Sequence, residues 1–239
     1  MKNLFDNVKQ DRNLLIGIFY TIFFCILAGI VNYYTAELSK LGWISNQARY
    51  LLWILLYLPL LYFTIGAKWK IKDFGFKLNN RSIVLSVIII ILYILFQQND
   101  VKSQLSFMDN LSEAFARTGE EVFFRGFVYL LIIKIFTRDK HTNLWAIILS
   151  SIIFTAVHTQ PGREIAGFSL FTTVIVICAI PRWVADSILP CVIIHLLGNE
   201  SLLAAVMGII IFLIITMVGW ISGENNIEII GDKKNKVNI

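Results

Sequence analysis

Long apolar runs separated by short polar segments dominate the sequence. Eight of them approach the roughly 20 residues with which an α-helix crosses a bilayer: they cover residues 14–34, 50–67, 82–96, 122–136, 143–158, 165–180, 183–197 and 201–221. The pattern predicts an all-α, polytopic membrane helix bundle of about eight transmembrane helices. No stretch has the composition of a soluble domain, so residues 1–239 are expected to form a single integral-membrane domain.

A weaker pattern lies between the third and fourth runs. Apolar residues recur there at helical spacing among polar ones, at Val101, Leu105, Met108, Leu111 and Phe115. This spacing predicts an amphipathic helix, which either lies in the membrane interface or extends the fourth span.

Composition supports a membrane protein and adds an orientation. Hydrophobic residues make up 57% of the chain and charged residues only 15%, and the mean hydropathy is +0.71. The net charge of +5 comes from Lys and Arg in a few loops, which indicates topology, and no nucleic-acid-binding module is present. Lys and Arg residues are much more frequent in one set of alternate loops, which includes Arg182, than in the other, which includes Arg117. Because positive residues favour the cytoplasmic side, this difference predicts that both termini are cytoplasmic. The many Ile, Asn and Lys residues favour a bacterial source and a cell-membrane location.

Three charged residues stand where the fourth apolar run begins. Charges inside a membrane cost roughly 2.5–3.5 kcal/mol each, which makes Glu120, Glu121 and Arg125 functional candidates. A structural interpretation is also open: Thr118 and Glu121 have the spacing of a capping box, and Glu121 can pair with Arg125 one turn later. Glu120 points elsewhere on the helix and has no expected local partner.

Further polar residues are expected at the same depth. His158 ends the fifth run, while His195 and Asn199 share one face near the end of the seventh, below a bend permitted by Pro190. Lipid offers no hydrogen-bond partners, so these groups and Glu120 are expected to face one another or a wet cavity.

Two chemistries fit such a set. A carboxylate beside histidines can act as a general base for water, with imidazole and amide groups stabilising an oxyanion. Alternatively Glu120, His158 and His195 are candidate ligands of a Zn²⁺ ion that activates the water. We favour the metal-independent mechanism, because the sequence indicates no carboxylate to support the histidines. The chain contains no HExxH zinc helix, GxSxG serine turn or GxGD aspartyl signature.

Three motifs carry a resemblance to a known family. Residues 120–126 (EEVFFRG), 154–158 (FTAVH) and 195–199 (HLLGN) resemble the EExxxR, FxxxH and HxxxN motifs of the CPBP family, also called Abi, of CAAX proteases and bacteriocin-processing enzymes. That family includes the type II CAAX prenyl endopeptidases. The resemblance places the catalytic core in residues 118–200.

The resemblance also implies residue roles. Glu120 and His158 are implied to activate the water, and His195 and Asn199 to stabilise the oxyanion. Glu121 is included in the catalytic set and, with Arg125, is implied to support the activating residues of the first motif. Phe154 is implied to support His158 in the second. The family is described both as metalloproteases and as glutamate proteases, so the resemblance leaves the metal open.

The expected function is an intramembrane endopeptidase. Its substrate is expected to be a small membrane-associated peptide or membrane protein, such as a bacteriocin or pheromone precursor, cleaved for processing or for self-immunity. The rival hypothesis is a non-catalytic bacteriocin-immunity or scaffold protein with the same fold. An ion or proton transporter would also use Glu and His, but the sequence has no inverted repeat.

Overall fold

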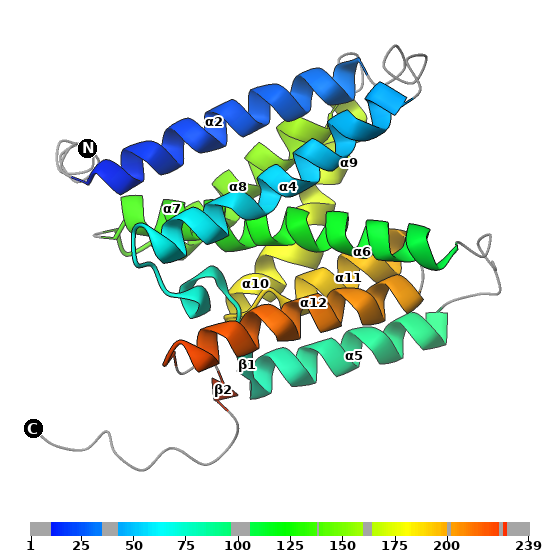
Figure 1. Ribbon diagram of the computed structural model, residues 1–239. Helices are drawn as coiled ribbons and strands as arrows, with labels where there is room; N and C mark the ends of the chain where they lie inside the picture. The colour runs from blue at the N-terminus through cyan, green and yellow to red at the C-terminus, as the bar shows by residue number, and fades with distance from the viewer. Residues whose placement is uncertain are drawn as a thin grey trace, which may run out of the picture.

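The computed structural model describes residues 11–34, 43–96, 106–137, 139–159, 164–199, 202–224 and 227–228. Figure 1 shows them as a bundle of helices. In chain order the elements are α2 (Arg12–Tyr33), α4 (Trp43–Ile65), η1 (Ile71–Phe74), β1 (Leu78–Asn79), α5 (Asn80–Phe96), α6 (Phe107–Glu121), η2 (Val122–Val128), α7 (Tyr129–Ile135), α8 (Thr142–His158), α9 (Glu164–Val174), η3 (Ile175–Ala179), α10 (Ile180–Ala185), α11 (Leu189–Asn199), α12 (Leu202–Ile221) and β2 (Ile227–Glu228). Apart from the short parallel pair β1–β2, the described chain is helical. The predicted all-α class is confirmed.

Three helical segments within the described residues are long and apolar enough to cross a membrane: Arg12–Val31, Ala166–Ala185 and Leu202–Ile221. Four shorter apolar helices accompany them, at Tyr50–Ile65, Asn80–Phe96, Thr142–His158 and Leu189–Gly198. Large apolar side chains such as Phe19 and Ile221 point outward and are more than two-thirds exposed, as lipid-facing residues are. The chain has the character of a membrane protein, and the number of eight spans stays a prediction.

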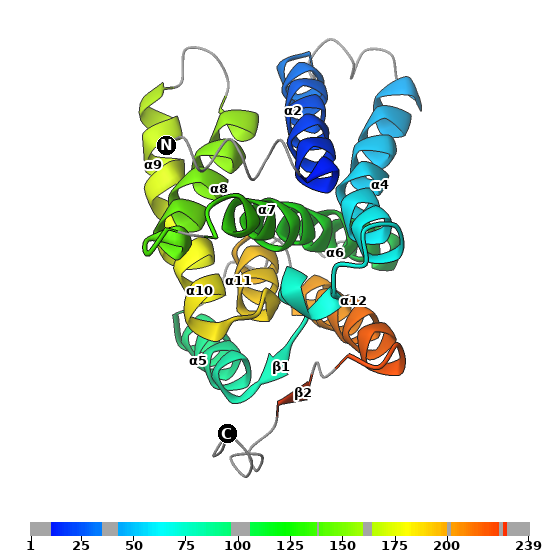
Figure 2. The ribbon, with the colours of Figure 1, turned by 90° about the vertical axis from the view of Figure 1, so that its left-hand side faces the viewer.

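The helix formed by α6, η2 and α7 is the central element of the bundle. It continues without a break from Phe107 to Ile135, and Figure 2 shows it near the middle, with α2, α4, α8, α11 and α12 around it. Each of these five helices contacts it. The predicted amphipathic helix is therefore an extension of the fourth apolar run; Val101 and Leu105 of that pattern lie outside the described residues.

This helix begins twelve residues before the predicted cap. The Ser106 hydroxyl accepts a hydrogen bond from the Asp109 backbone N–H (3.2 Å), and the Asp109 carboxylate accepts one from the Ser106 N–H (3.3 Å). The capping box is thus Ser106 with Asp109, and the alternative interpretation of Thr118 and Glu121 as a cap is wrong. Because the chain is already helical there, Arg117 is a helix residue and was wrongly assigned to a loop.

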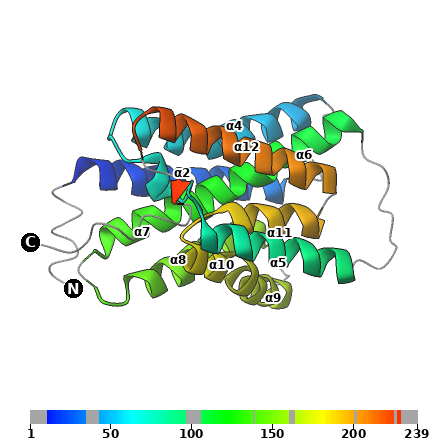
Figure 3. The same cartoon turned by 90° about the horizontal axis from the view of Figure 1, so that it is seen from below.

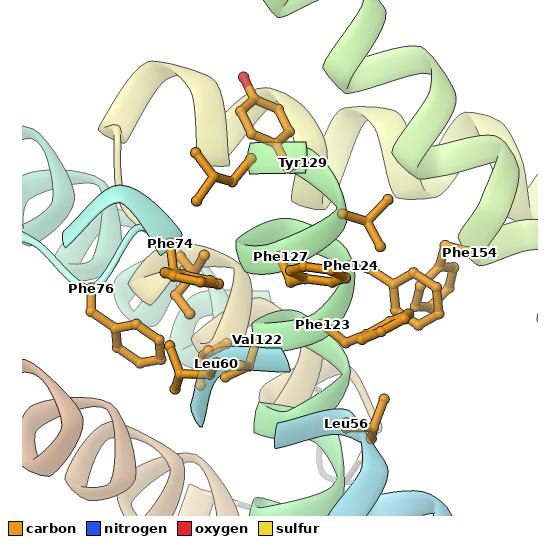
Figure 4. Packing of buried hydrophobic residues seen from close by; sticks show 14 of the residues in the cluster. Leu56, Leu60, Phe74, Phe76, Val122, Phe123, Phe124, Phe127, Tyr129 and Phe154 are labelled. Carbon is orange, nitrogen blue, oxygen red and sulfur yellow. The ribbon is translucent and has the colours of Figure 1, made fainter. Parts of the chain in front are cut away.

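Side chains of η2 anchor this central helix to its neighbours. The segment has the wide turn of a π-helix, and all seven of its residues are buried. Figure 4 shows its phenylalanines in the core. They contact aromatic rings of three other helices: Phe123 packs on Phe24 of α2 (centroids 4.3 Å apart), Phe127 on Phe63 of α4 (5.0 Å) and Phe124 on Phe154 of α8 (5.0 Å). This packing fixes the rotation of the helix, and with it the direction of the charged residues.

Two glycines allow α4 and α12 to approach α6 closely. A Cβ atom on Gly119 of α6 would lie 2.8 Å from the Tyr57 ring of α4. A Cβ atom on Gly208 of α12 would lie 2.2 Å from Leu196 of α11 and 3.0 Å from the Thr118 hydroxyl. Side chains larger than hydrogen at these positions would push the helices apart.

The predicted seventh run, 183–197, is divided between two helices. The chain stays helical from α9 through η3 to Ala185 and ends in the left-handed conformation at Asp186, with φ 51°. Helix α11 then begins at Leu189, so Pro190 lies in its first turn, where a missing N–H is tolerated. The predicted bend at Pro190 was wrong, because no helix precedes it there.

Arg182 was also wrongly assigned to a loop. It lies in α10 and is only 3% exposed, since its guanidinium has polar and aromatic partners inside the bundle. It donates hydrogen bonds to the Arg125 carbonyl (3.1 Å) and to the Asp186 carboxylate (3.3 Å), and it lies over the Tyr129 ring. Arg182 therefore attaches the end of α10 to η2. Figure 3, a view from below, shows α10 beside α8 and α11.

Candidate active site

Glu120 lies in the last turn of α6, and its two oxygens have different surroundings. Oε1 accepts a hydrogen bond from Arg117 Nη1 at 3.0 Å, and Arg117 also pairs with Glu113 (3.3 Å). The expectation that Glu120 lacks a local partner was therefore wrong. Oε2 is buried and has no hydrogen-bond partner among the described residues. This second oxygen is directed at two histidines.

His158 is the last residue of α8 and approaches Glu120 from one side. Its Nδ1 lies 2.8 Å from the Phe154 carbonyl oxygen, and a carbonyl can only accept, so Nδ1 carries the proton. The Nε2 of the neutral ring is then an acceptor, and it lies 3.9 Å from Glu120 Oε2. The imidazole also stacks on the Phe154 ring, with centroids 4.1 Å apart and planes at 18°.

His195 of α11 lies between the two glutamates. Its Nδ1 is 2.9 Å from Glu121 Oε1 and its Nε2 is 3.5 Å from Glu120 Oε2. A carboxylate that accepts from Nδ1–H fixes the ring orientation and directs Nε2 toward Glu120. The structure thus supplies the carboxylate support for a histidine that the sequence did not indicate.

Glu121 and Arg125 form the predicted ion pair in the bundle interior. Both side chains are fully buried, and Arg125 Nε lies 3.8 Å from Glu121 Oε2. Uncompensated charges would be very costly at such a position. Arg125 therefore compensates the charge of Glu121 from the side of Oε2, and His195 Nδ1–H donates a hydrogen bond to Oε1.

Three helices therefore bring three acceptor atoms to one point: Glu120 Oε2, His158 Nε2 and His195 Nε2. With both rings protonated on Nδ1, all three atoms carry lone pairs toward one another. Three acceptors cannot form hydrogen bonds with one another. A water molecule between them, or an additional proton on one of them, supplies the missing hydrogen-bond donor. Asn199 ends α11, and its side chain lies outside the described part of the structure.

A zinc ion is the alternative to a water molecule at this point. Among the described residues, no group of three or more His, Cys, Asp or Glu side chains is arranged to hold a metal ion. One carboxylate oxygen and two imidazole nitrogens are a chemically suitable donor set for zinc, and each histidine has the kind of Nδ1 partner that zinc-bound histidines usually have. The chemistry below is derived for water alone.

Arg117 is the site residue that the sequence analysis missed. It lies three residues before Glu120, and Glu113 lies four before Arg117, so the three share one face of α6. The spacing was visible in the sequence, but treating Arg117 as a loop residue removed it from consideration. Its role is to hold Oε1 of Glu120, which leaves Oε2 directed at the histidines.

Residues 111–201 match the model of a family described as type II CAAX prenyl endopeptidase Rce1-like. Comparison with curated proteins and with solved structures gives no significant match. The matched segment begins in α6 and ends just after α11, so it contains Glu120, His158 and His195. The resemblance that the three motifs predict is thus confirmed over residues 111–201, where the chain is similar to the Rce1-like type II CAAX prenyl endopeptidases, as expected of a CPBP family protease.

Proposed function

We propose that this protein is an intramembrane endopeptidase in which Glu120, His158 and His195 activate a water molecule. One observation carries the proposal: Glu120 Oε2, buried and without a hydrogen-bond partner among the described residues, lies 3.5 Å and 3.9 Å from the Nε2 atoms of the two histidines. A water at this point is within one hydrogen bond of each group, which is the reach that general acid–base catalysis requires.

In the first step the water oxygen attacks the carbonyl carbon of the scissile peptide. Glu120 Oε2 accepts the proton that the water loses. His158 Nε2 accepts a hydrogen bond from the second O–H of the water and so orients its attacking lone pair. Arg117 holds the other oxygen of Glu120, which keeps the carboxylate in place during this transfer. General base catalysis of this kind contributes about 10²- to 10⁴-fold in rate.

The tetrahedral intermediate carries a negative oxygen that needs a donor. His195 can supply it when Nε2 is protonated, and Glu121 on Nδ1 stabilises the resulting imidazolium, as a carboxylate does in a catalytic triad. The proton on Glu120 then passes to the peptide nitrogen, and the C–N bond breaks. We assign Asn199 as a second donor from its motif position alone.

The substrate is proposed to be a small membrane-associated peptide or membrane protein. A site enclosed by apolar helices reaches segments that are themselves held in the membrane, and soluble globular proteins are excluded from it. Processing of a bacteriocin or pheromone precursor, or self-immunity, fits this class. We extend the proposal to eight spans with both termini in the cytoplasm.

The experiment is cleavage in reconstituted liposomes. The full chain is incubated with an S-farnesylated peptide ending in a CAAX sequence and with an unlipidated apolar peptide of about 20 residues, long enough to span the bilayer. Products are read by mass spectrometry, beside Glu120→Gln as control. Cleavage by the wild type that Glu120→Gln lacks supports the proposal. A folded wild type that cleaves neither peptide favours the non-catalytic scaffold instead.

A further inference from the structure

Arg125 contacts two residues that each hold one of the histidines. Its guanidinium carbon lies 4.8 Å from the centre of the Phe154 ring, on which His158 stacks at 4.1 Å. Its Nε lies 3.8 Å from Glu121, whose other oxygen is 2.9 Å from His195 Nδ1. One buried cation thus stands behind both imidazoles, although it touches neither the proposed water nor Glu120.

These contacts close a ring of six side chains. From Glu120 the sequence of contacts runs through His158, Phe154, Arg125, Glu121 and His195, and back to Glu120. The members come from α6, η2, α8 and α11. A closed ring restrains its members more than an open chain does, because a rotation of one side chain must be accommodated by two neighbours.

We propose that Arg125 and Phe154 are positioning residues that fix the orientation of the two histidines. Phe154 acts on His158, on which it stacks, and Arg125 acts on His158 through Phe154 and on His195 through Glu121. This inference rests on the proposed function for its kinetic consequences, but the orientation of the rings is a property of the protein alone. The second motif is then explained in full: Phe154 gives His158 its stacking surface through the ring and its Nδ1 acceptor through the carbonyl.

The planar guanidinium matters as much as the charge. Arginine stacks on an aromatic face and pairs with a carboxylate at the same time, whereas the lysine ammonium is a compact point charge. The separation of 3.8 Å from Glu121 is too long for a hydrogen bond, so the ring contact is needed to hold Arg125 in place. Arg125→Lys is therefore expected to keep the charge balance and to release both histidines.

Substitutions of two buried phenylalanines separate the loss of stacking on His158 from the loss of packing. Phe154→Leu removes the stacking surface, and Phe154→Tyr restores it. Phe212→Leu is the control: Phe212 of α12 is fully buried and stacks on Phe76 at 5.4 Å, so it loses a similar ring contact without a neighbouring histidine. An effect of lost packing alone would appear equally in both Leu variants.

The first measurement is ¹⁵N NMR of histidine-labelled full-length protein, which distinguishes the two neutral tautomers. The chain has three histidines, and the exposed His141 before α8 is an internal reference. In the wild type, His158 is expected in the single Nδ1–H form. Phe154→Leu is expected to give His158 a mixture of tautomers and to change His195 less, Arg125→Lys to change both, and Phe212→Leu to change neither.

The second measurement is steady-state cleavage of whichever liposome peptide the wild type cuts. Outer partners of metal-bound histidines contribute about 10- to 100-fold, and we expect a factor of similar size here. Phe154→Leu is therefore expected to lower kcat by that factor with little change in KM, and Phe154→Tyr to keep the wild-type value. A single His158 tautomer in Phe154→Leu, or equal effects in Phe212→Leu, would overturn the inference. Should no peptide be cleaved, the proposed function fails, while the NMR result still decides this inference.

Discussion

Glu121 Oε1 lies 2.9 Å from Nδ1 of His195, across a sequence separation of 74 residues. This contact joins the central helix to α11, and it occurs where the Glu121 side chain is fully buried. Its other oxygen faces Arg125, which is equally buried. Glu121 therefore serves the stability of the bundle and the orientation of a histidine at once, and the two roles can be separated by substitution.

Glu121→Gln is expected to destabilise the protein by about 3–5 kcal/mol, because it leaves the Arg125 charge buried without its partner. The double variant Glu121→Gln/Arg125→Met removes both charges and is expected to recover much of this loss. Its cleavage rate should nevertheless remain low, since His195 still lacks its carboxylate. Denaturation in mild detergent measures the stabilities. A double variant no more stable than Glu121→Gln would contradict the assignment of a buried ion pair.

Glu120→Gln is expected to abolish cleavage without loss of stability. The amide has the size of the carboxylate, and its oxygen can still accept from Arg117, but it cannot take a proton from water. A loss of about 10²- to 10⁴-fold follows from removing a general base. Liposome cleavage beside a melting curve checks both parts. Full proteolysis by a normally folded Glu120→Gln protein would exclude Glu120 as the base.

The sequence was sufficient to predict the helices and the meeting of Glu120, His158 and His195, because apolar runs have characteristic lengths and polar groups in lipid need partners. It was misleading where a helix extends past its apolar run. Ser106 and Asp109 cap α6 well before the apolar residues start, so the spacing of Thr118 and Glu121 was mistaken for a cap. A capping box has the same spacing as ordinary neighbours on a helix face, and only the upstream chain distinguishes them.

Contacts between residues far apart in the sequence were the second feature that the sequence could not predict. The Glu121–His195 contact depends on the rotation of two helices about their axes, which the packing of Phe123, Phe124 and Phe127 sets. Arg182 looked like a loop cation because it lies between the apolar runs 165–180 and 183–197, yet the wide turn η3 and the helix α10 continue the chain through Pro181. Such turns have no simple sequence signature, and they moved the helix end from residue 180 to residue 185.

Gly208→Ala is expected to destabilise the bundle by about 1–3 kcal/mol, the usual cost of overpacking. The added methyl would meet Leu196, the neighbour of His195, at 2.2 Å. Gly29→Ala in α2 is the matched control, because nothing lies within 4 Å of its Cβ position. That change is expected to be neutral or to stabilise by about 0.5–1 kcal/mol, through the better helix propensity of alanine. Comparable effects of the two changes would show that α12 does not pack on α11 as described.

Proteolysis is expected to be independent of zinc. Each histidine has an Nδ1 partner, so the Nε2 atoms and Glu120 Oε2 remain to bind a water molecule, and among the described residues no group of three His, Cys, Asp or Glu side chains is arranged to hold a metal ion. A water activated by Glu120 needs no Lewis acid, whereas a zinc enzyme needs one metal per chain. Elemental analysis of the purified protein and cleavage in the presence of a chelator test this together. Stoichiometric zinc, with cleavage lost on chelation and restored by zinc alone, would contradict this expectation and make Glu120, His158 and His195 the candidate zinc ligands.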